Sequence, residues 1–213
     1  MVTERDGLVS EGSLIAIVGP MLTSDKPAHA PARAASLPPE ERRTTIVAAA
    51  LPLLVEHGEA VTTKQIADAA GIAEGTIFRV FPDKDSVIRA VIDAVFDNQP
   101  LELALAEIAL DRPLEKVLEA GIALLQERVV SIWRVAASVG PRFHDSTRRS
   151  LIVSPWLEGV LTEHRQELSL KPTEAARVLQ SLTLAVTHPN LAETPMAPAQ
   201  IVHLFLHGAG RGA

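Results

Sequence analysis

The 213-residue chain contains no cysteine and no tyrosine, and aromatic residues make up only 3% of it. Without cysteine the chain cannot form disulfide bonds, thiolate metal sites or iron–sulfur clusters. No apolar run approaches the roughly 18 residues that a membrane-spanning helix requires. Acidic residues precede the short apolar segment LIAIV, so a signal peptide is not expected. These absences predict a cytoplasmic protein that does not bind a membrane, and no cofactor is expected.

The chain also has no excess of basic over acidic residues. The chain has 20 lysine and arginine residues against 26 aspartate and glutamate residues, which gives a net charge of −6. Proteins that bind nucleic acid through bulk charge are usually basic, so this chain can bind DNA only through a few well-placed cations. Hydrophobic residues make up 47% of the sequence, alanine and leucine dominate them, and no alternating strand pattern is visible. This composition predicts an all-α fold.

Prolines and helical periodicity divide the chain into three parts. Residues 1–39 contain five prolines and no periodic apolar pattern, which predicts a flexible N-terminal arm. Residues 40–88 follow, and their pattern predicts short helices that form a helix–turn–helix DNA-binding domain. Residues 89–213 read as helix nearly throughout and are expected to form a second helical domain.

A helix–turn–helix is predicted around the stretch AAGIAEGTIFRVFPDKD, which begins at Ala69. Thr62 or Thr63 is a suitable N-cap for the first of its two helices, and Gly71 is a suitable end for that helix. The second helix is predicted at about 74–80. Two short helices joined by a glycine turn are typical of a helix–turn–helix, whose second helix enters the major groove of DNA.

Several side chains of this motif are suited to contact DNA. Arg79 can form two hydrogen bonds to guanine, and Thr76 can bond to a base edge or a phosphate. Residues at helix starts can bind phosphate together with the free N–H groups there. On these grounds the predicted contacts are Arg42, Arg43, Thr63, Lys64, Thr76, Arg79 and Lys84.

The stretches RRTTIVAAALPLLVEHG and VTTKQIADAAGIAEGTIFRVFPDKDSVI resemble the TetR family of bacterial transcriptional regulators. The resemblance covers about Arg42 to Ile88. It implies an all-helical homodimer in which the N-terminal domain binds a palindromic operator in double-stranded DNA. It also implies that residues 89–213 bind an unknown small-molecule effector and dimerise, and that the effector releases a repressor from DNA. By position, the resemblance adds Phe78 to the predicted DNA contacts.

The sequence departs from the family pattern in three places. Ala73 stands where a capping serine is common, Phe78 replaces a frequent tyrosine, and Pro52 lies inside the first helix. The loss of the tyrosine hydroxyl puts a phosphate contact at Phe78 in doubt. Pro52 removes one backbone donor and is expected to bend its helix.

The C-terminal part has no comparably specific motif. Its last two long helices resemble those that form a dimer bundle in the family, and their apolar stripes support this. The dimer-interface candidates are Leu179, Leu182, Val186, Ile201 and Phe205. The candidates for a ligand pocket are Arg128, Trp133, Phe143, His144 and Trp156, although core packing explains the aromatic residues equally well.

Other functions fit the sequence less well. His203 and His207 are four residues apart on a helix, as two metal ligands can be, but no third ligand is evident, so no metal site is predicted. The sequence offers no nucleophile elbow and no paired carboxylates with a positioned partner, so an enzyme is not expected. A helical sensor that acts through protein contacts, without binding DNA, remains the alternative to a DNA-binding regulator.

Overall fold

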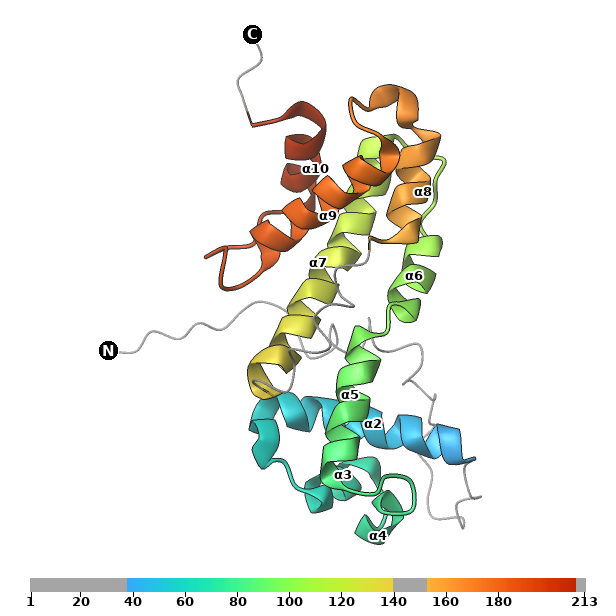
Figure 1. Cartoon of the computed structure of the whole chain (residues 1–213), viewed down its shortest axis with the longest axis vertical. Coiled ribbons are helices and arrows are strands. Elements are labelled where there is room, and N and C mark those ends of the chain that lie inside the picture. Colours follow the sequence, from blue (N-terminus) through green and yellow to red (C-terminus); the bar gives the residue numbers. More distant parts are fainter. Residues whose placement is uncertain (1–37, 140–152, 210–213) are drawn as a thin grey trace, which may run out of the picture.

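The computed structural model describes residues 38–139 and 153–209. Within these ranges it contains helices and no strands, so the all-α prediction is confirmed (Figure 1). None of the described helices is long and apolar enough to cross a membrane. In chain order the elements are α2 (Pro39–His57), the 3-10 turn η2 (Gly58–Ala60), α3 (Thr63–Ala70), α4 (Glu74–Ile77), α5 (Lys84–Phe96), α6 (Gln99–Ala106), α7 (Leu114–Val139), α8 (Pro155–Glu163), η5 (Arg165–Glu167), α9 (Pro172–Thr187) and α10 (Pro198–His207).

Local chemistry sets both ends of α3, as the sequence predicts. The Thr62 hydroxyl accepts a hydrogen bond from the Gln65 backbone N–H at 3.2 Å, and the Gln65 side chain accepts one from the Thr62 N–H at 2.9 Å. This reciprocal pair is a capping box, which satisfies two donors that the helix itself leaves without partners. Gly71 ends the helix with φ 65° and ψ 33°, a left-handed conformation that glycine adopts without a steric penalty.

Helix α4 is shorter than the sequence predicts, because it ends at Ile77 rather than near Val80. Beyond Ile77, the N–H of Val80 bonds to the Ile77 carbonyl at 2.9 Å, three residues back, so the chain tightens into a turn. Pro82 then disfavours a helical conformation at Phe81, and the Phe81 side chain is buried at 1% exposure. The turn therefore directs Phe81 into the core and places α5 directly after it.

Two hydrophobic clusters hold the chain together, and helix α7 takes part in both. The first cluster joins α2 to α5 and receives Val135 and Val139 from the end of α7. The second contains residues of α6, α8, α9 and α10 and receives Leu118 and Ile122 from the first half of α7. Figure 1 shows α7 running from the C-terminal helices down to the unit formed by α2 to α5. A single rigid helix thus connects the two clusters.

The change from one cluster to the other occurs between Phe96, in the first, and Leu101, in the second. The division of the chain at residue 88 stays a prediction, and α5 continues past that point. Most of the arm expected in residues 1–39 lies outside the described residues, as do Phe143 and His144.

Candidate nucleic-acid interface

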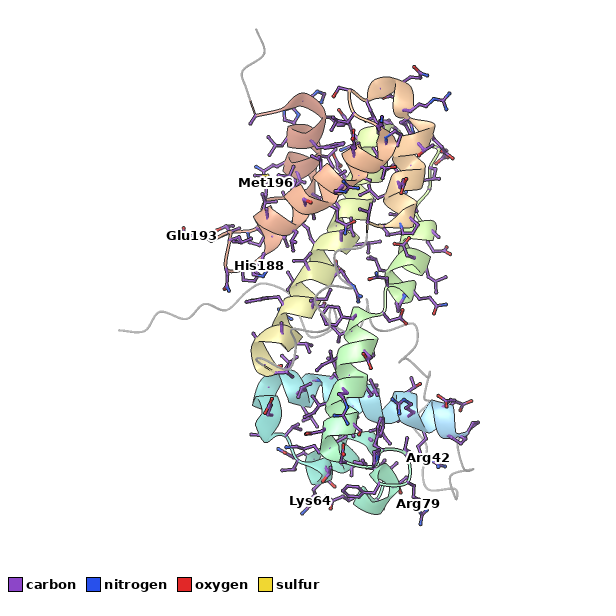
Figure 2. The ribbon with its side chains drawn as sticks, viewed as in Figure 1. Arg42, Lys64, Arg79, His188, Glu193 and Met196 are labelled. Atoms are coloured by element: carbon purple, nitrogen blue, oxygen red, sulfur yellow. The ribbon has the colours of Figure 1, made fainter. Side chains whose placement is uncertain are left out.

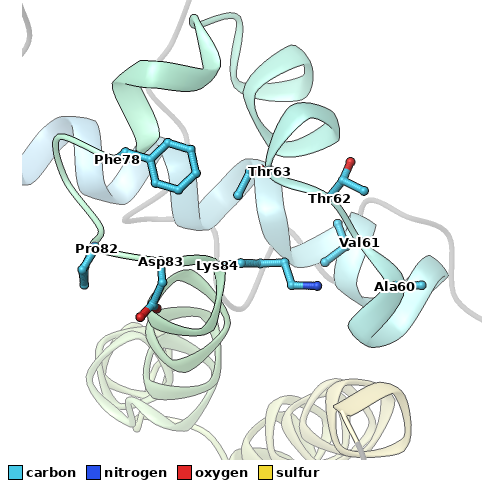
Figure 3. A pocket seen from close by; sticks show the side chains of 8 residues that line it. All are labelled: Ala60, Val61, Thr62, Thr63, Phe78, Pro82, Asp83 and Lys84. Atoms are coloured by element: carbon cyan, nitrogen blue, oxygen red, sulfur yellow. The ribbon is translucent and has the colours of Figure 1, made fainter.

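A shallow hollow of about 360 Å³ opens on the N-terminal unit where three segments meet (Figure 3). The connection from η2 to α3 forms one side, and the end of α4 with the turn into α5 forms the other. Three of the predicted DNA contacts, Thr63, Phe78 and Lys84, lie together here. The full lining is Ala60, Val61, Thr62, Thr63, Phe78, Pro82, Asp83 and Lys84.

Helices α3 and α5 both begin at this hollow. The first N–H groups of a helix have no carbonyl partner within it, and they carry the positive end of the helix dipole. Thr62 caps one donor of α3, which leaves the N–H groups of Thr63 and Lys64 without an intrahelical partner. Such groups bind phosphate in many proteins, so the start of α3 is suited to an anion.

Asp83 caps α5 and is itself a fixed negative charge at the rim of the hollow. Its Oδ1 atom accepts hydrogen bonds of 2.6 Å from both the hydroxyl and the backbone N–H of Ser86. These bonds, the one from the hydroxyl first, lower the pKa of Asp83 below its ordinary value. Asp83 therefore orders the turn before α5, and it is not suited to contact a phosphate.

Lys84 and Thr63 are both engaged within the chain. The Lys84 ammonium donates to the backbone carbonyl of Glu59 at 2.8 Å, which fixes it at the hollow and leaves two of its three N–H donors for a ligand. The Thr63 hydroxyl donates to a carboxylate oxygen of Glu74 at 2.6 Å. Because that proton is already used, a phosphate contact at Thr63 falls to its backbone N–H rather than to the predicted side chain.

The remaining candidates of the motif differ in exposure. Lys64 and Arg79 are exposed, and Figure 2 shows both at the same end of the molecule, with Arg42 nearby. Among the described residues the Arg79 side chain has no hydrogen-bond or ion-pair partner. Thr76 is half-buried, whereas Phe78 is 52% exposed although it is a large apolar side chain. Arg79, in the turn that follows α4, is thus an exposed cation that is available to a base edge.

The two arginines of α2 have partners within the chain. The Arg43 guanidinium carbon lies 4.5 Å from the centre of the Phe81 ring, a cation–π contact. Arg42 is half-buried and also interacts within the chain. Arg43 therefore helps to hold the turn before α5 in place, a role that the sequence did not indicate.

Comparison with known proteins finds similarity to one family in the N-terminal unit. Residues 46–91 match the model of the bacterial regulatory proteins of the tetR family. The chain is 39% identical over 83 residues to YvkB, an HTH-type transcriptional regulator of Bacillus subtilis, and 35% identical over 82 residues to the HTH-type transcriptional regulator HbdR of an Aromatoleum species. These matches cover 38% of this chain, and 42% and 36% of the relatives.

The helix–turn–helix part of the chain therefore matches that of the TetR family. The aligned part of the chain spans about two fifths of the length of these relatives. A TetR family protein of Vibrio parahaemolyticus shares the fold over 78% of this chain and 97% of its own, with a TM-score of 0.55 and 18% identity.

Two further solved structures share the fold and were determined with small molecules. FadR of Bacillus subtilis, in complex with stearoyl-CoA, has a TM-score of 0.51 at 18% identity and covers 78% of this chain and 98% of its own. LfrR of Mycobacterium smegmatis, in complex with proflavine, has a TM-score of 0.50 at 19% identity and covers 81% and 98%.

The C-terminal helices enclose a second cavity of about 240 Å³. It lies among α6, α7, α9 and the start of α8. Of the predicted pocket residues, Arg128 lines it. Trp133 instead packs against His188, with ring centres 4.2 Å apart, and Trp156 packs in the second hydrophobic cluster. Of the predicted pocket residues that lie within the described ranges, only Arg128 lines this cavity.

The residues of the predicted dimer interface differ in their exposure. Leu179 and Ile201 have 0% exposure because they pack inside the second hydrophobic cluster of their own chain. These two side chains cannot face another protomer in this arrangement. Leu182, Val186 and Phe205 are partly exposed, so the interface stays a prediction for them.

His203 and His207 of α10 are not part of a cluster that could hold a metal ion. Their rings lie 4.7 Å apart, and the Nε2 atom of His207 is 3.2 Å from a carboxylate oxygen of Glu115. Among the described residues, no group of three or more histidine, aspartate or glutamate side chains is placed to hold a metal ion. The pair is better described as a surface contact between α10 and α7.

Proposed function

We propose that the chain is a transcriptional regulator that binds a palindromic operator as a homodimer and that a small molecule releases it from DNA. The main support is the hollow at the starts of α3 and α5. There Lys84, Phe78 and the first N–H groups of α3 surround a space open to a phosphate. In this proposal that hollow takes the DNA backbone, while α4 enters the major groove.

Base recognition is assigned to α4 and to the turn after it, which carries Arg79. Arg79 is exposed and has no partner among the described residues, so its guanidinium is available for a guanine edge. Lys64 lies at the same end of the molecule and is assigned to the phosphate backbone (Figure 2). In a symmetric dimer the two α4 helices are expected about 34–36 Å apart, one turn of DNA.

Release by a small molecule is assigned to the C-terminal cavity. That cavity includes Asn98 and Arg128, and Asn98 follows α5 directly in the chain. Helix α7, which carries Arg128, also packs on the N-terminal cluster through Val135 and Val139. A ligand that moves either element changes the position of the helix–turn–helix. The ligand complexes of FadR and LfrR, which share the fold, support a ligand role for this part of the chain.

The proposal is tested by fluorescence anisotropy with labelled DNA taken from upstream of the protein's own gene. Binding should weaken linearly on a log–log plot as salt concentration rises, because phosphate contacts release counterions. Arg79→Ala should cost about 1–3 kcal/mol of specific affinity and relax the preference for one base pair. Lys64→Ala should weaken binding to all sequences and reduce the salt dependence.

The matched control is Arg165→Ala, which removes an exposed arginine from η5 in the C-terminal part. It should leave DNA affinity unchanged. If the wild-type protein does not bind any DNA at low ionic strength, the proposed function is wrong and a sensor that acts through protein contacts becomes the better hypothesis. A footprint on a single asymmetric half-site would contradict the symmetric dimer.

A further inference from the structure

Arg128 is a buried cation whose hydrogen-bonding capacity is largely unused. It lies in the middle of α7, its exposure is 5%, and it lines the C-terminal cavity. One terminal nitrogen donates to the Asn98 side-chain oxygen at 3.1 Å, and the Nε atom has no hydrogen-bond partner. An arginine carries five N–H donors in a fixed fork. A buried charge without an ion-pair partner destabilises the folded protein, unless a ligand supplies that partner.

The nearby carboxylates do not form a direct ion pair with Arg128. In the described part of the chain Arg128 forms no ion pair within 4.0 Å. Glu102 lines the same cavity, but its two oxygens accept from the Ser154 hydroxyl at 2.7 Å and from the Trp156 N–H at 3.2 Å. Asp97 accepts from the Gln99 N–H at 3.0 Å. Asp97 therefore accepts a hydrogen bond at the start of α6, and Glu102 accepts hydrogen bonds at the start of α8.

Burial and the charge of Asp97 shift the pKa of Arg128 in opposite directions. Burial lowers its pKa to about 10, and the charge of Asp97 offsets part of that effect. The guanidinium still carries its charge at neutral pH, and it lacks a close counterion. A second arginine, Arg177, lines the same cavity. The residues that line the cavity thus include two arginines, Arg128 and Arg177, and one carboxylate, Glu102.

The rest of the lining fits a small molecule with an apolar body. Leu125, Ile132 and Leu184 are among the apolar side chains that line it, whereas Gln180 and Thr183 supply polar groups. Its volume of about 240 Å³ is slightly below the roughly 300–1,000 Å³ of most ligand pockets. A small ligand with one acidic end matches both this size and this distribution of polarity.

We propose that the cavity takes a small amphipathic carboxylic acid, whose carboxylate pairs with the Arg128 guanidinium while its apolar part packs against Leu125, Ile132 and Leu184. The pair supplies the acceptor that the Nε atom lacks, because a carboxylate accepts two parallel N–H bonds from an arginine. This inference rests on the proposed function, since it names the chemical class of the effector assigned to that cavity.

The test compares acids with neutral molecules of the same shape. Hexanoate and benzoate, with hexanamide and benzamide as matched neutral probes, are titrated into the full chain by isothermal calorimetry. At least one acid should bind about 10-fold or more tightly than its amide, since a hydrogen bond to a charged group contributes more than a neutral one. Arg128→Gln and Arg128→Met should both abolish this preference, whereas Arg165→Gln, in η5, should retain it.

Two variants of Arg128 are included because a folding defect in one would hide the result. Circular dichroism and DNA binding establish that each variant is folded. The inference is overturned if neither acid binds, if the amides bind as tightly as the acids, or if either folded Arg128 variant keeps the preference for acid. If an acid binds through Arg128 but DNA affinity does not change, the inference stands and release by this ligand, part of the proposed function, is wrong.

Discussion

The indole ring of Trp156 lies directly over Gly121, at the contact between α8 and α7. A β-carbon on Gly121 would fall 2.4 Å from the Cζ3 atom and 2.5 Å from the Cη2 atom of that ring. The backbone N–H of Trp156 also donates to a carboxylate oxygen of Glu102 on α6. This one residue therefore fixes the distances among α6, α7 and α8, which together form much of the cavity that contains Arg128.

Gly121→Ala should lower the stability of the protein although alanine is the better helix former. The added methyl group forces the indole to move, and overpacking of this kind costs about 1–3 kcal/mol. The gain in helix propensity, about 1 kcal/mol, offsets only part of that cost. Urea denaturation measures the difference. Gly159→Ala in α8 is the control: nothing lies within 4 Å of its β-carbon position, so it should raise stability. Equal effects of the two substitutions would contradict the close contact.

Phe78→Tyr should strengthen DNA binding by about 3- to 10-fold, the value of one added hydrogen bond. Phe78 is 52% exposed and lines the hollow beside Lys84, so the new hydroxyl would be available to donate to a phosphate there. Stability should change little because the side chain is exposed. Anisotropy with operator DNA measures the effect, and Phe78→Leu, which adds no hydroxyl, serves as the control that should not strengthen binding. A weaker complex for Phe78→Tyr would mean that DNA packs against the ring itself.

Asp83→Ala should lower the melting temperature at neutral pH but not in acid. The pKa of Asp83 in the folded protein is below its ordinary value of 3.8, so the ionised carboxylate stabilises the fold above that pH. As the pH falls through the folded pKa, the carboxylate is protonated and this contribution is lost. The difference in melting temperature from wild type should therefore shrink below pH 3.8. Asp111→Ala removes an exposed aspartate between α6 and α7 and should not change the melting temperature at neutral pH.

Elements that are fixed by neighbouring residues could be predicted from the sequence. The start of α3 depends on Thr62 and Gln65, three positions apart, and its end depends on the left-handed turn at Gly71. The start of α8 depends on Ser154, whose hydroxyl accepts from the Leu157 N–H. Such contacts need no knowledge of the tertiary fold, and the predicted boundaries of α3 are confirmed.

Features that depend on distant contacts could not be predicted in this way. The apolar stripe of α9 indicates that Leu179 is buried, but not whether its own chain or a second protomer covers it. The aromatic residues gave no sign that Trp156 would pack on Gly121 rather than line a cavity. The hydrogen bond from Lys84 to Glu59 joins residues 25 positions apart, and no short motif carries that information.

Arg128→Met should raise the stability of the protein in the absence of any ligand. Burial disfavours the charged form, as the lowered pKa shows, so the positive charge destabilises the folded state at neutral pH. Methionine has a similar length and carries no charge. Replacing a buried ion pair with hydrophobic residues is often neutral or stabilising by about 1–4 kcal/mol, and removing one unpaired buried charge should act in the same direction. Urea denaturation of the unliganded protein measures the change. Arg177→Met, at an exposed arginine that also lines the cavity, should have a smaller effect. A large loss of stability in Arg128→Met would show instead that the bond to Asn98 holds α6 against α7, so that the charge is structural rather than reserved for a ligand.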